Sequence, residues 1–228
     1  MTARASNASP HKENKASPVK DKPAKDHKNP KDAETQPLFV LASASPRRRE
    51  LLEACGLSFE IVPAEVDESP GPNESPEALV TRLSALKAQR VQRLRPWLPV
   101  ISADTLVALG NKIFGKPESL PEARAMLGEL SGQTHRVVTG YCVTRPGQEA
   151  AKPGLVTTKI AFRKLTAREI DWYLSLNQSL DKAGAYALQM GGGFLVDWLE
   201  GSYTSVIGLP LRETLEALSE ALGSPLPA

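Results

Sequence analysis

The chain has 228 residues, 41% of them hydrophobic, which is enough to bury a core in one globular domain, or in one domain with a tail. Its 28 basic and 26 acidic residues give a net charge of +2. So small a charge does not favour binding to nucleic acid or to a membrane surface. Residues 1–37 hold eight basic and five acidic residues, which leaves 20 basic and 21 acidic residues for the remainder. The globular part is therefore nearly neutral, and nucleic acid is not an expected partner.

The two cysteines, Cys55 and Cys142, do not have the spacing of a zinc site. So few cysteines in a chain of this size indicate a reduced compartment, and we expect a cytoplasmic location. No run of eighteen apolar residues occurs, so no membrane span is predicted. The N-terminus also lacks the apolar centre of a signal peptide.

Residues 1–37 are predicted to be a disordered tail. They consist mainly of Lys, Pro, Ser, Asn, Asp and Ala, and Val19 is the only large apolar residue after Met1. Such a segment cannot bury enough surface to offset its chain entropy. A solvated extension is the preferred interpretation, and the alternatives are a polyanion-binding tail or a transit peptide, the latter disfavoured by the acidic residues.

From residue 38 to the C-terminus, strand and helix patterns alternate as in one α/β domain. Strands are expected at 38–42, 58–66, 134–145 and 154–165, and 191–203 has strand and turn character. Residues 99–117 are expected to hold a buried strand, a polar interruption that includes Asp104, and a Gly-Asn turn. Helices are expected at 45–56, 75–94, 120–130, 167–176 and 209–222. Because 134–145 and 154–165 have the pattern of paired antiparallel strands, the prediction is a mixed sheet rather than a pure βαβ series.

Three helix starts have recognisable capping signals. Ser45 precedes Pro46 and predicts an N-cap, while Ser119 with Glu122, and Thr166 with Glu169, have the capping-box spacing.

The first helix begins with three consecutive arginines, although the N-terminal end of a helix is already positive. An anion bound at that corner would remove the conflict, with the Ser43 and Ser45 hydroxyls beside it. Arg47 lies closest to such an anion, and Arg48 is on the inward face of the helix. Arg49 has Glu53 at i+4 and is predicted to be an ordinary surface partner. The alternative is a solvated basic helix end.

Two carboxylates have candidate roles in chemistry. Asp104 follows an apolar run, where a carboxylate is costly without partners, so it is a candidate general base or metal ligand at a strand end. Glu68 lies at the end of another expected strand. The alternatives are a turn-capping aspartate for Asp104 and a solvated turn residue for Glu68.

Four further side chains bear on the function of the chain. Lys116 sits between Gly115 and Pro117 and suits a phosphate contact. Lys87 either covers the core with its aliphatic stem or reaches a phosphate tail. Gln189 has an amide that can both donate and accept, as a uracil or thymine edge requires, although a loop glutamine is the alternative. His135 has no visible acid–base partner, which disfavours a histidine-based triad.

Seven motifs in order resemble the Maf family of nucleoside triphosphate pyrophosphatases. They are LASASPRRRELL, VDE, RLSALKA, SADTLVALGNKIFGKP, LSGQTHRVVTG, DKAGAYALQ and GSYTSVIGLPL. The resemblance covers the chain from residue 38 to the last helix. It implies the Maf and inosine-triphosphatase-like fold, in which a mixed twisted sheet flanked by helices leaves a cleft for a nucleotide.

The resemblance also implies hydrolysis of a nucleoside triphosphate to a monophosphate and pyrophosphate, with a divalent cation such as Mg²⁺, Mn²⁺ or Co²⁺. It implies Asp104 as proton acceptor and Glu68 and Asp104 as metal ligands. The residues implied to bind substrate are Ser43, Ser45, Arg47, Arg48, Lys87 and Lys116. Those implied to choose the base are Arg47, Thr105 and Gln189. The ADT and AYALQ motifs resemble the subfamily that acts on dTTP and UTP, and the family suggests a homodimer.

Two alternative functions remain open from the sequence. One is a nucleotide-binding regulator of cell division with little catalysis. The other is a polyanion-binding module that uses the basic tail and Arg47–Arg49.

Overall fold

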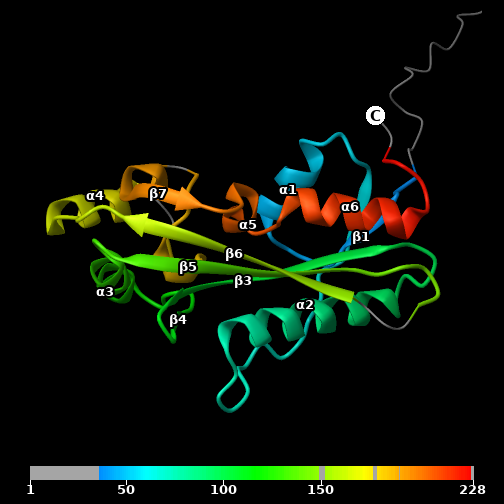
Figure 1. Ribbon diagram of the computed structural model, residues 1–228, viewed down its shortest axis with the longest axis horizontal. Coiled ribbons are helices and arrows are strands. Elements are labelled where there is room, and N and C mark those ends of the chain that lie inside the picture. The colour runs from blue at the N-terminus through cyan, green and yellow to red at the C-terminus, as the bar shows by residue number, and fades with distance from the viewer. Residues whose placement is uncertain (1–35, 149–151, 177–178, 190, 227–228) are drawn as a thin grey trace, which may run out of the picture. The chain divides into compact units, whose positions relative to one another are not determined.

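The computed structural model describes residues 36–148, 152–176, 179–189 and 191–226, so the predicted tail lies outside the described residues up to position 35. Figure 1 shows the elements along this part of the chain. The strands are β1 (Phe39–Leu41), β2 (Phe59–Ile61), β3 (Val100–Leu109), β4 (Lys112–Phe114), β5 (Thr134–Val143), β6 (Lys152–Phe162) and β7 (Val196–Glu200). The helices are α1 (Pro46–Glu53), α2 (Pro76–Gln92), α3 (Leu120–Leu130), α4 (Ala167–Leu176), α5 (Tyr203–Ile207) and α6 (Leu211–Leu222). Two short 3₁₀ turns are η2 (Ala183–Ala185) and η3 (Gly192–Leu195).

The strands form one seven-stranded sheet in the order β2-β1-β3-β5-β6-β7, and β4 pairs with β3 as a hairpin. Strand β1 is parallel to β2 and β3, whereas β3, β5, β6 and β7 follow one another antiparallel. The predicted α/β fold with a mixed sheet is therefore confirmed, as is the antiparallel pairing of β5 with β6.

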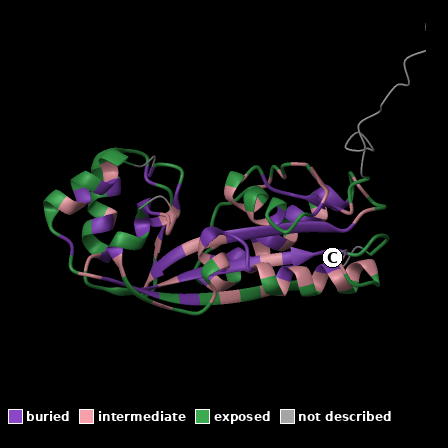
Figure 2. Ribbon diagram, turned by 90° about the horizontal axis from the view of Figure 1, so that it is seen from above, coloured by how far each residue is buried: buried purple, intermediate pink, exposed green. Residues whose placement is uncertain are grey.

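Helices cover both faces of the long strands. Helix α2 lies on one face, and α1 and α6 lie on the other (Figure 1). The buried positions follow the strands and the sheet-facing sides of these helices (Figure 2). None of the helices in the described part of the chain combines the length and apolar character that a membrane crossing needs.

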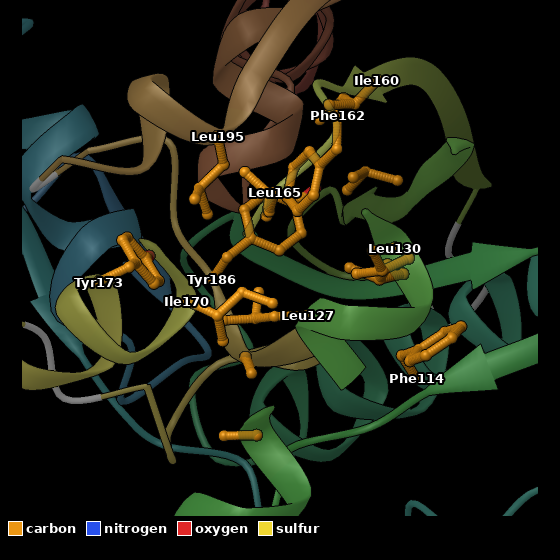
Figure 3. Packing of buried hydrophobic residues seen from close by; sticks show 14 residues of the cluster. Phe114, Leu127, Leu130, Ile160, Phe162, Leu165, Ile170, Tyr173, Tyr186 and Leu195 are labelled. Atoms are coloured by element: carbon orange, nitrogen blue, oxygen red, sulfur yellow. The ribbon is translucent and has the colours of Figure 1, made fainter. Parts of the chain in front are cut away.

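The apolar interior has two main clusters. One joins β1, α1 and α6 and includes Phe39, Leu41, Leu52, Ile101 and Leu218. The other joins α3, α4 and the 3₁₀ turns, and Figure 3 shows its close packing. Its labelled members are Phe114, Leu127, Leu130, Ile160, Phe162, Leu165, Ile170, Tyr173, Tyr186 and Leu195.

A glycine allows α2 to lie unusually close to the sheet. Gly140 of β5 pairs with Asp104 of β3, and a Cβ at Gly140 would come within 2.3 Å of the Val80 carbonyl oxygen. Any larger residue would therefore force the helix away from the strands. Because the helix can approach here, its later residue Lys87 reaches the side chain of Asp104.

The structure corrects two placements that were predicted from the sequence. Strand β3 runs without interruption through Asp104, so this residue is in the middle of a strand and not at its end. Strand β2 ends at Ile61, so Glu68 belongs to an irregular loop and not to a strand end. In both cases the apolar pattern indicated a strand but not its length.

The helix starts agree with the predictions except for one side chain. Ser119 accepts a hydrogen bond from the Glu122 amide, and Thr166 and Glu169 form a reciprocal capping box. Ser45 occupies the N-cap position of α1 before Pro46, but its side chain forms no capping hydrogen bond. The first turn of α1 also contains no acidic residue. The positive end of this helix is therefore left for another anion.

Candidate active site

One cavity of about 660 Å³ brings together every site residue predicted from the sequence. These are Ser43, Ser45, Arg47, Arg48, Glu68, Lys87, Asp104, Thr105, Lys116 and Gln189. They come from the corner before α1, the first turn of α1, the loop after β2, helix α2, strand β3, the loop after β4 and the segment after η2. The fold therefore collects residues that lie up to about 150 positions apart into one wall.

The centre of the site is a lysine between two carboxylates. Lys87 Nζ lies 2.6 Å from Asp104 Oδ1 and 2.7 Å from Glu68 Oε1. Lys87 and Asp104 are buried, with exposed fractions of 7% and 8%. The two sequence interpretations of Lys87 both missed this contact, since they considered the core and a phosphate but not a carboxylate from β3. Removing Lys87 would leave the buried charge of Asp104 without its counter-charge.

Glu68 is the more solvated of the two carboxylates. Burial alone would raise its pKa, but the hydrogen bond from Lys87 and the charges of Lys87, Lys116 and Arg48 keep the pKa below its ordinary value. The carboxylate is therefore ionised at neutral pH. Lys116, which is exposed at the cavity, acts on Glu68 through its charge.

Arg48 points inward from α1, as predicted, and is held by three oxygens. Its Nε atom donates to the Gly208 carbonyl at 2.8 Å, and its terminal nitrogens donate to Ser43 Oγ at 2.9 Å and to Thr105 Oγ1 at 3.5 Å. Burial lowers the pKa of Arg48, and the nearby Asp104 partly offsets that effect. A guanidinium nevertheless stays charged in proteins, so Arg48 supplies a fixed cation behind the cavity.

Arg47 stands nearer the solvent and has a partner that was not predicted. Its Nη1 atom lies 3.4 Å from Asp181 Oδ2, and Lys182 Nζ lies 2.5 Å from Asp181 Oδ1. Burial raises the pKa of Asp181, but the hydrogen bond from Lys182 and the charges of Lys182 and Arg47 lower it below its ordinary value. Arg49 pairs with Glu53 at 3.4 Å outside the cavity, which confirms the prediction that separated it from the other two arginines.

The corner before α1 supplies hydroxyls rather than a helix cap. Ser43 Oγ accepts a hydrogen bond from the Ser45 amide at 3.2 Å and another from Arg48. Both serines line the cavity. This arrangement presents hydroxyls beside the uncapped positive end of α1, which suits a phosphate oxygen.

Thr105 and Gln189 line another part of the same cavity. Thr105 Oγ1 lies 3.1 Å from Thr139 Oγ1 on the neighbouring strand, and Thr139 donates to the Ser205 carbonyl. Gln189 is half-buried and follows Ala187 and Leu188, which also line the cavity. An amide and a hydroxyl next to apolar residues are the groups that could bind a nucleobase.

Among the polar residues of the cavity wall, sequence reasoning missed three, namely Asp181, Lys182 and Tyr186. All three belong to the DKAGAYALQ motif, of which only the glutamine was interpreted. An adjacent acid and base directly before a run of small residues is the signal that could have found the first two.

His135 has a partner that is remote in sequence. Its Nε2 atom lies 2.8 Å from the Tyr186 hydroxyl, and its ring packs edge-on against Phe162 and Tyr186. Burial lowers the pKa of His135 to about 4, so the ring is neutral at pH 7. Among the described residues its Nδ1 atom has no hydrogen-bond partner. The histidine therefore supports the cavity wall behind Tyr186.

The carboxylates are compatible with a divalent cation that also binds the substrate. In the described part of the chain, no three His, Cys, Asp or Glu side chains gather in a way that could hold a metal ion by themselves. Glu68 and Asp104 each use one oxygen for Lys87, and the other oxygen of each makes no hydrogen bond within the described residues. Mg²⁺ is commonly bound by one or two carboxylates together with phosphates and water, so this donor set fits it.

The sequence of this chain is similar to those of known proteins of one family. Residues 38–221 match the family described as Maf-like protein. A dTTP/UTP pyrophosphatase of Myxococcus xanthus is 49% identical over 192 residues, which cover 84% of this chain and 96% of the relative. A dTTP/UTP pyrophosphatase of Anaeromyxobacter dehalogenans is 46% identical over 193 residues, covering 84% and 97%. One of Syntrophus aciditrophicus is 41% identical over 182 residues, covering 80% and 89%.

Proposed function

Because this chain belongs to the Maf family, we propose that it hydrolyses dTTP and UTP to the nucleoside monophosphate and pyrophosphate. The observation that carries the proposal is the cavity that gathers Lys87, Asp104 and Glu68 with the arginines of α1. The relatives named for dTTP and UTP match this chain over most of their length and supply the choice of substrate. Modified pyrimidine nucleotides belong to the same chemical class.

The charges around the cavity suit a nucleoside triphosphate. Among the described residues five cations line it, namely Arg47, Arg48, Lys87, Lys116 and Lys182. Three carboxylates oppose them, which leaves an excess of two positive charges. A triphosphate carries a larger negative charge than this, and a bound divalent cation reduces the difference. The cavity is therefore suited to a nucleotide together with its metal ion.

Asp104 is the general base in this proposal. It accepts a proton from water while the water oxygen forms a bond to the α-phosphorus, and the bond between that phosphorus and the bridging oxygen to the β-phosphate breaks. The leaving group is pyrophosphate. Lys87 fixes one oxygen of Asp104 at 2.6 Å, so the carboxylate meets the substrate in a defined orientation.

A divalent cation, Mg²⁺ or else Mn²⁺ or Co²⁺, would be held by Glu68 and Asp104. When bound, it neutralises negative charge on the phosphates. Lys116, Arg48 and the serine hydroxyls of the corner before α1 then orient the phosphate oxygens from the protein side.

In this proposal the nucleobase of the substrate lies near Thr105, Gln189 and Arg47. Gln189 can donate to a carbonyl oxygen and accept from the ring N–H of uracil or thymine. The edge of guanine presents two adjacent N–H donors, which a carboxylate can accept with both oxygens, whereas an amide has only one acceptor oxygen.

The test is a panel of dTTP, UTP, CTP and GTP with purified protein and direct detection of pyrophosphate, with and without Mg²⁺. We expect pyrophosphate from dTTP and UTP and little from GTP. Release of phosphate without pyrophosphate would contradict the bond assignment. Tight binding of dTTP without turnover would instead favour the nucleotide-binding regulator.

We further propose a cytoplasmic location and assembly as a homodimer. Cys55 and Cys142 are free thiols, which suits a reducing compartment. The dimer is suggested by the family alone, and a molar mass from light scattering equal to one chain would exclude it.

A further inference from the structure

The segment that carries Glu68 is an irregular loop along one wall of the cavity. This Glu68 loop (residues 63–75) connects β2 to α2, and no regular element is formed within it. Four of its residues line the cavity, namely Pro63, Ala64, Glu68 and Pro70. A loop of this kind has no backbone ladder to place a side chain, so side-chain contacts have to do so.

One arginine of α2 provides most of these contacts. Arg82 Nε donates to Glu74 Oε1 at 2.7 Å, and Arg82 Nη2 donates to Glu74 Oε2 at 2.8 Å. The same Nη2 atom donates to the Ser69 carbonyl at 3.0 Å. Glu74 Oε2 also accepts from the Gly71 amide at 2.8 Å, which closes the turn in which Asn73 has a φ of 56°.

These contacts lie directly beside Glu68, the carboxylate that the loop contributes to the cavity. Ser69 is the residue after Glu68, and Lys87, which binds Glu68 at 2.7 Å, is on the same helix as Arg82. Helix α2 therefore holds the loop at two neighbouring points, the Ser69 carbonyl and the Glu68 carboxylate.

This set of contacts requires an arginine at position 82. The expected effect of the arginine is confined to the Glu68 loop. A planar guanidinium can bind a carboxylate with two parallel bonds and still reach a carbonyl, whereas an ammonium cannot form this fork. The Arg82 side chain is 37% exposed, and ion pairs at such positions contribute little to global stability. Its effect is thus expected on the loop and not on the fold.

We propose that Arg82, through Glu74 and the Ser69 carbonyl, is a positioning residue that holds Glu68 beside the Lys87–Asp104 pair for metal binding. This inference rests on the proposed function in that it takes Glu68 as a ligand of the divalent cation. Arg82 itself does not line the cavity, so it acts only through the loop.

The chain contains a matched control at the other end of the same helix. Arg95, just after α2, binds Glu60 of β2 with two nitrogens, Nη2 to Oε1 at 2.6 Å and Nε to Oε2 at 2.9 Å. Both side chains of this pair are 34% exposed, and neither lines the cavity. Arg95→Gln therefore removes a similar fork just beyond the C-terminal end of α2 without touching the Glu68 loop.

The experiment compares Arg82→Gln, Arg82→Lys and Arg95→Gln with the wild type of the full chain. Mn²⁺ is titrated into protein saturated with a dTTP analogue whose α–β bridging oxygen is replaced by a methylene group, with an analogue-only blank; free Mn²⁺ is followed by electron paramagnetic resonance, and hydrogen exchange is measured for residues 63–75. We expect Arg82→Gln to weaken Mn²⁺ binding about tenfold to a hundredfold and to speed exchange in the loop. Arg82→Lys keeps the charge but not the fork and should recover part of the affinity, while Arg95→Gln should match the wild type.

Mn²⁺ affinity of Arg82→Gln equal to that of Arg95→Gln would overturn the proposal, even with faster exchange in the loop, because Arg82 would then have a purely structural role. A wild type that binds no Mn²⁺ would overturn it as well. Failure of the proposed function looks different: the wild type would release no pyrophosphate from dTTP, while the order of Mn²⁺ affinities among the variants would remain as expected.

Discussion

Asp104 and Glu68 contact the same ammonium group, yet the chain holds these two carboxylates by different means. Asp104 is in the middle of β3, pairs with Gly140 across the sheet, and is 8% exposed. Glu68 is in an irregular loop, and its side chain is 58% exposed. The backbone ladder fixes the first, whereas hydrogen bonds from Lys87 and the neighbouring Arg82 contacts hold the second.

This difference indicates which role each carboxylate can fill. A general base has to meet the attacking water at a defined position, which a central strand provides. A ligand that shares a cation with the substrate has to adapt when the phosphates arrive, and a loop can move at lower cost. The two carboxylates should therefore respond differently to the same chemical change.

The largest expected effect is that of Asp104→Asn. The amide can still accept a hydrogen bond from Lys87, so the fold should persist, but it cannot accept the proton of water. We expect the kcat for dTTP to fall by about 10²–10⁴-fold. Steady-state kinetics with pyrophosphate detection measures the loss, and Asp197→Asn on the exposed part of β7 serves as the control. Turnover of dTTP by Asp104→Asn near the wild-type rate would remove Asp104 from the mechanism.

The contrast between positions fixed by local backbone structure and positions fixed by tertiary contacts also explains which features could be predicted from the sequence. The mixed sheet, the positions of the helix starts and ten polar residues of the cavity were predictable, because apolar periodicity, capping signals and ordered motifs are local properties of the chain. The separation of Arg49 from Arg47 and Arg48 followed from helical spacing and was confirmed by the Arg49–Glu53 pair.

The remaining features depend on tertiary contacts. The bond between Lys87 and Asp104 requires the close approach of α2 to Gly140, and the His135–Tyr186 pair joins residues 51 positions apart. Neither distance is encoded by a local pattern. The uninterrupted course of β3 through Asp104 was missed because a lone charge in an apolar run indicates a strand end unless its partner is known.

His135 is a second buried residue of the sheet that can be compared with Asp104. Its partner, the Tyr186 hydroxyl, is neutral, whereas Asp104 is bound to the charged Lys87. Its pKa is about 4 in the folded protein, against an ordinary value of 6.5. Between these values the unfolded chain binds a proton that the folded protein does not, so the free energy of unfolding falls as the pH drops from 6.5 towards 4. The loss should reach about 3 kcal/mol, and it should be absent in His135→Gln, which can still bond to Tyr186.

Urea unfolding of both proteins at several pH values between 7 and 4 measures this loss. Parallel pH profiles for His135→Gln and the wild type would show that the buried imidazole does not cause it. The imidazole is already neutral at pH 7, so its titration should not set the pH dependence of turnover above about pH 5.

Glu68→Gln should have a smaller effect than Asp104→Asn and one of a different kind. Glutamine can keep the hydrogen bond to Lys87 but loses the charge that attracts a cation. The Mg²⁺ concentration for half-maximal turnover should rise about tenfold, and high Mg²⁺ should recover most of kcat. Glu65→Gln in the same loop is the control, since Glu65 is exposed and does not line the cavity. A loss of kcat that Mg²⁺ cannot recover would mean that Glu68, like Asp104, acts in the chemical step.

The smallest expected effect is that of Gln189→Glu, which tests whether the base is recognised by a residue outside the sheet. A carboxylate can accept from the donors of guanine but cannot donate to the carbonyl of uracil or thymine. Since a single hydrogen bond contributes about 0.5–1.5 kcal/mol, the ratio of kcat/KM for dTTP over GTP should fall about three- to tenfold. Gln133→Glu, at an exposed position outside the cavity, should leave the ratio unchanged. An unchanged ratio in Gln189→Glu would shift base recognition to the strand-held Thr105, whose hydroxyl is fixed by Thr139.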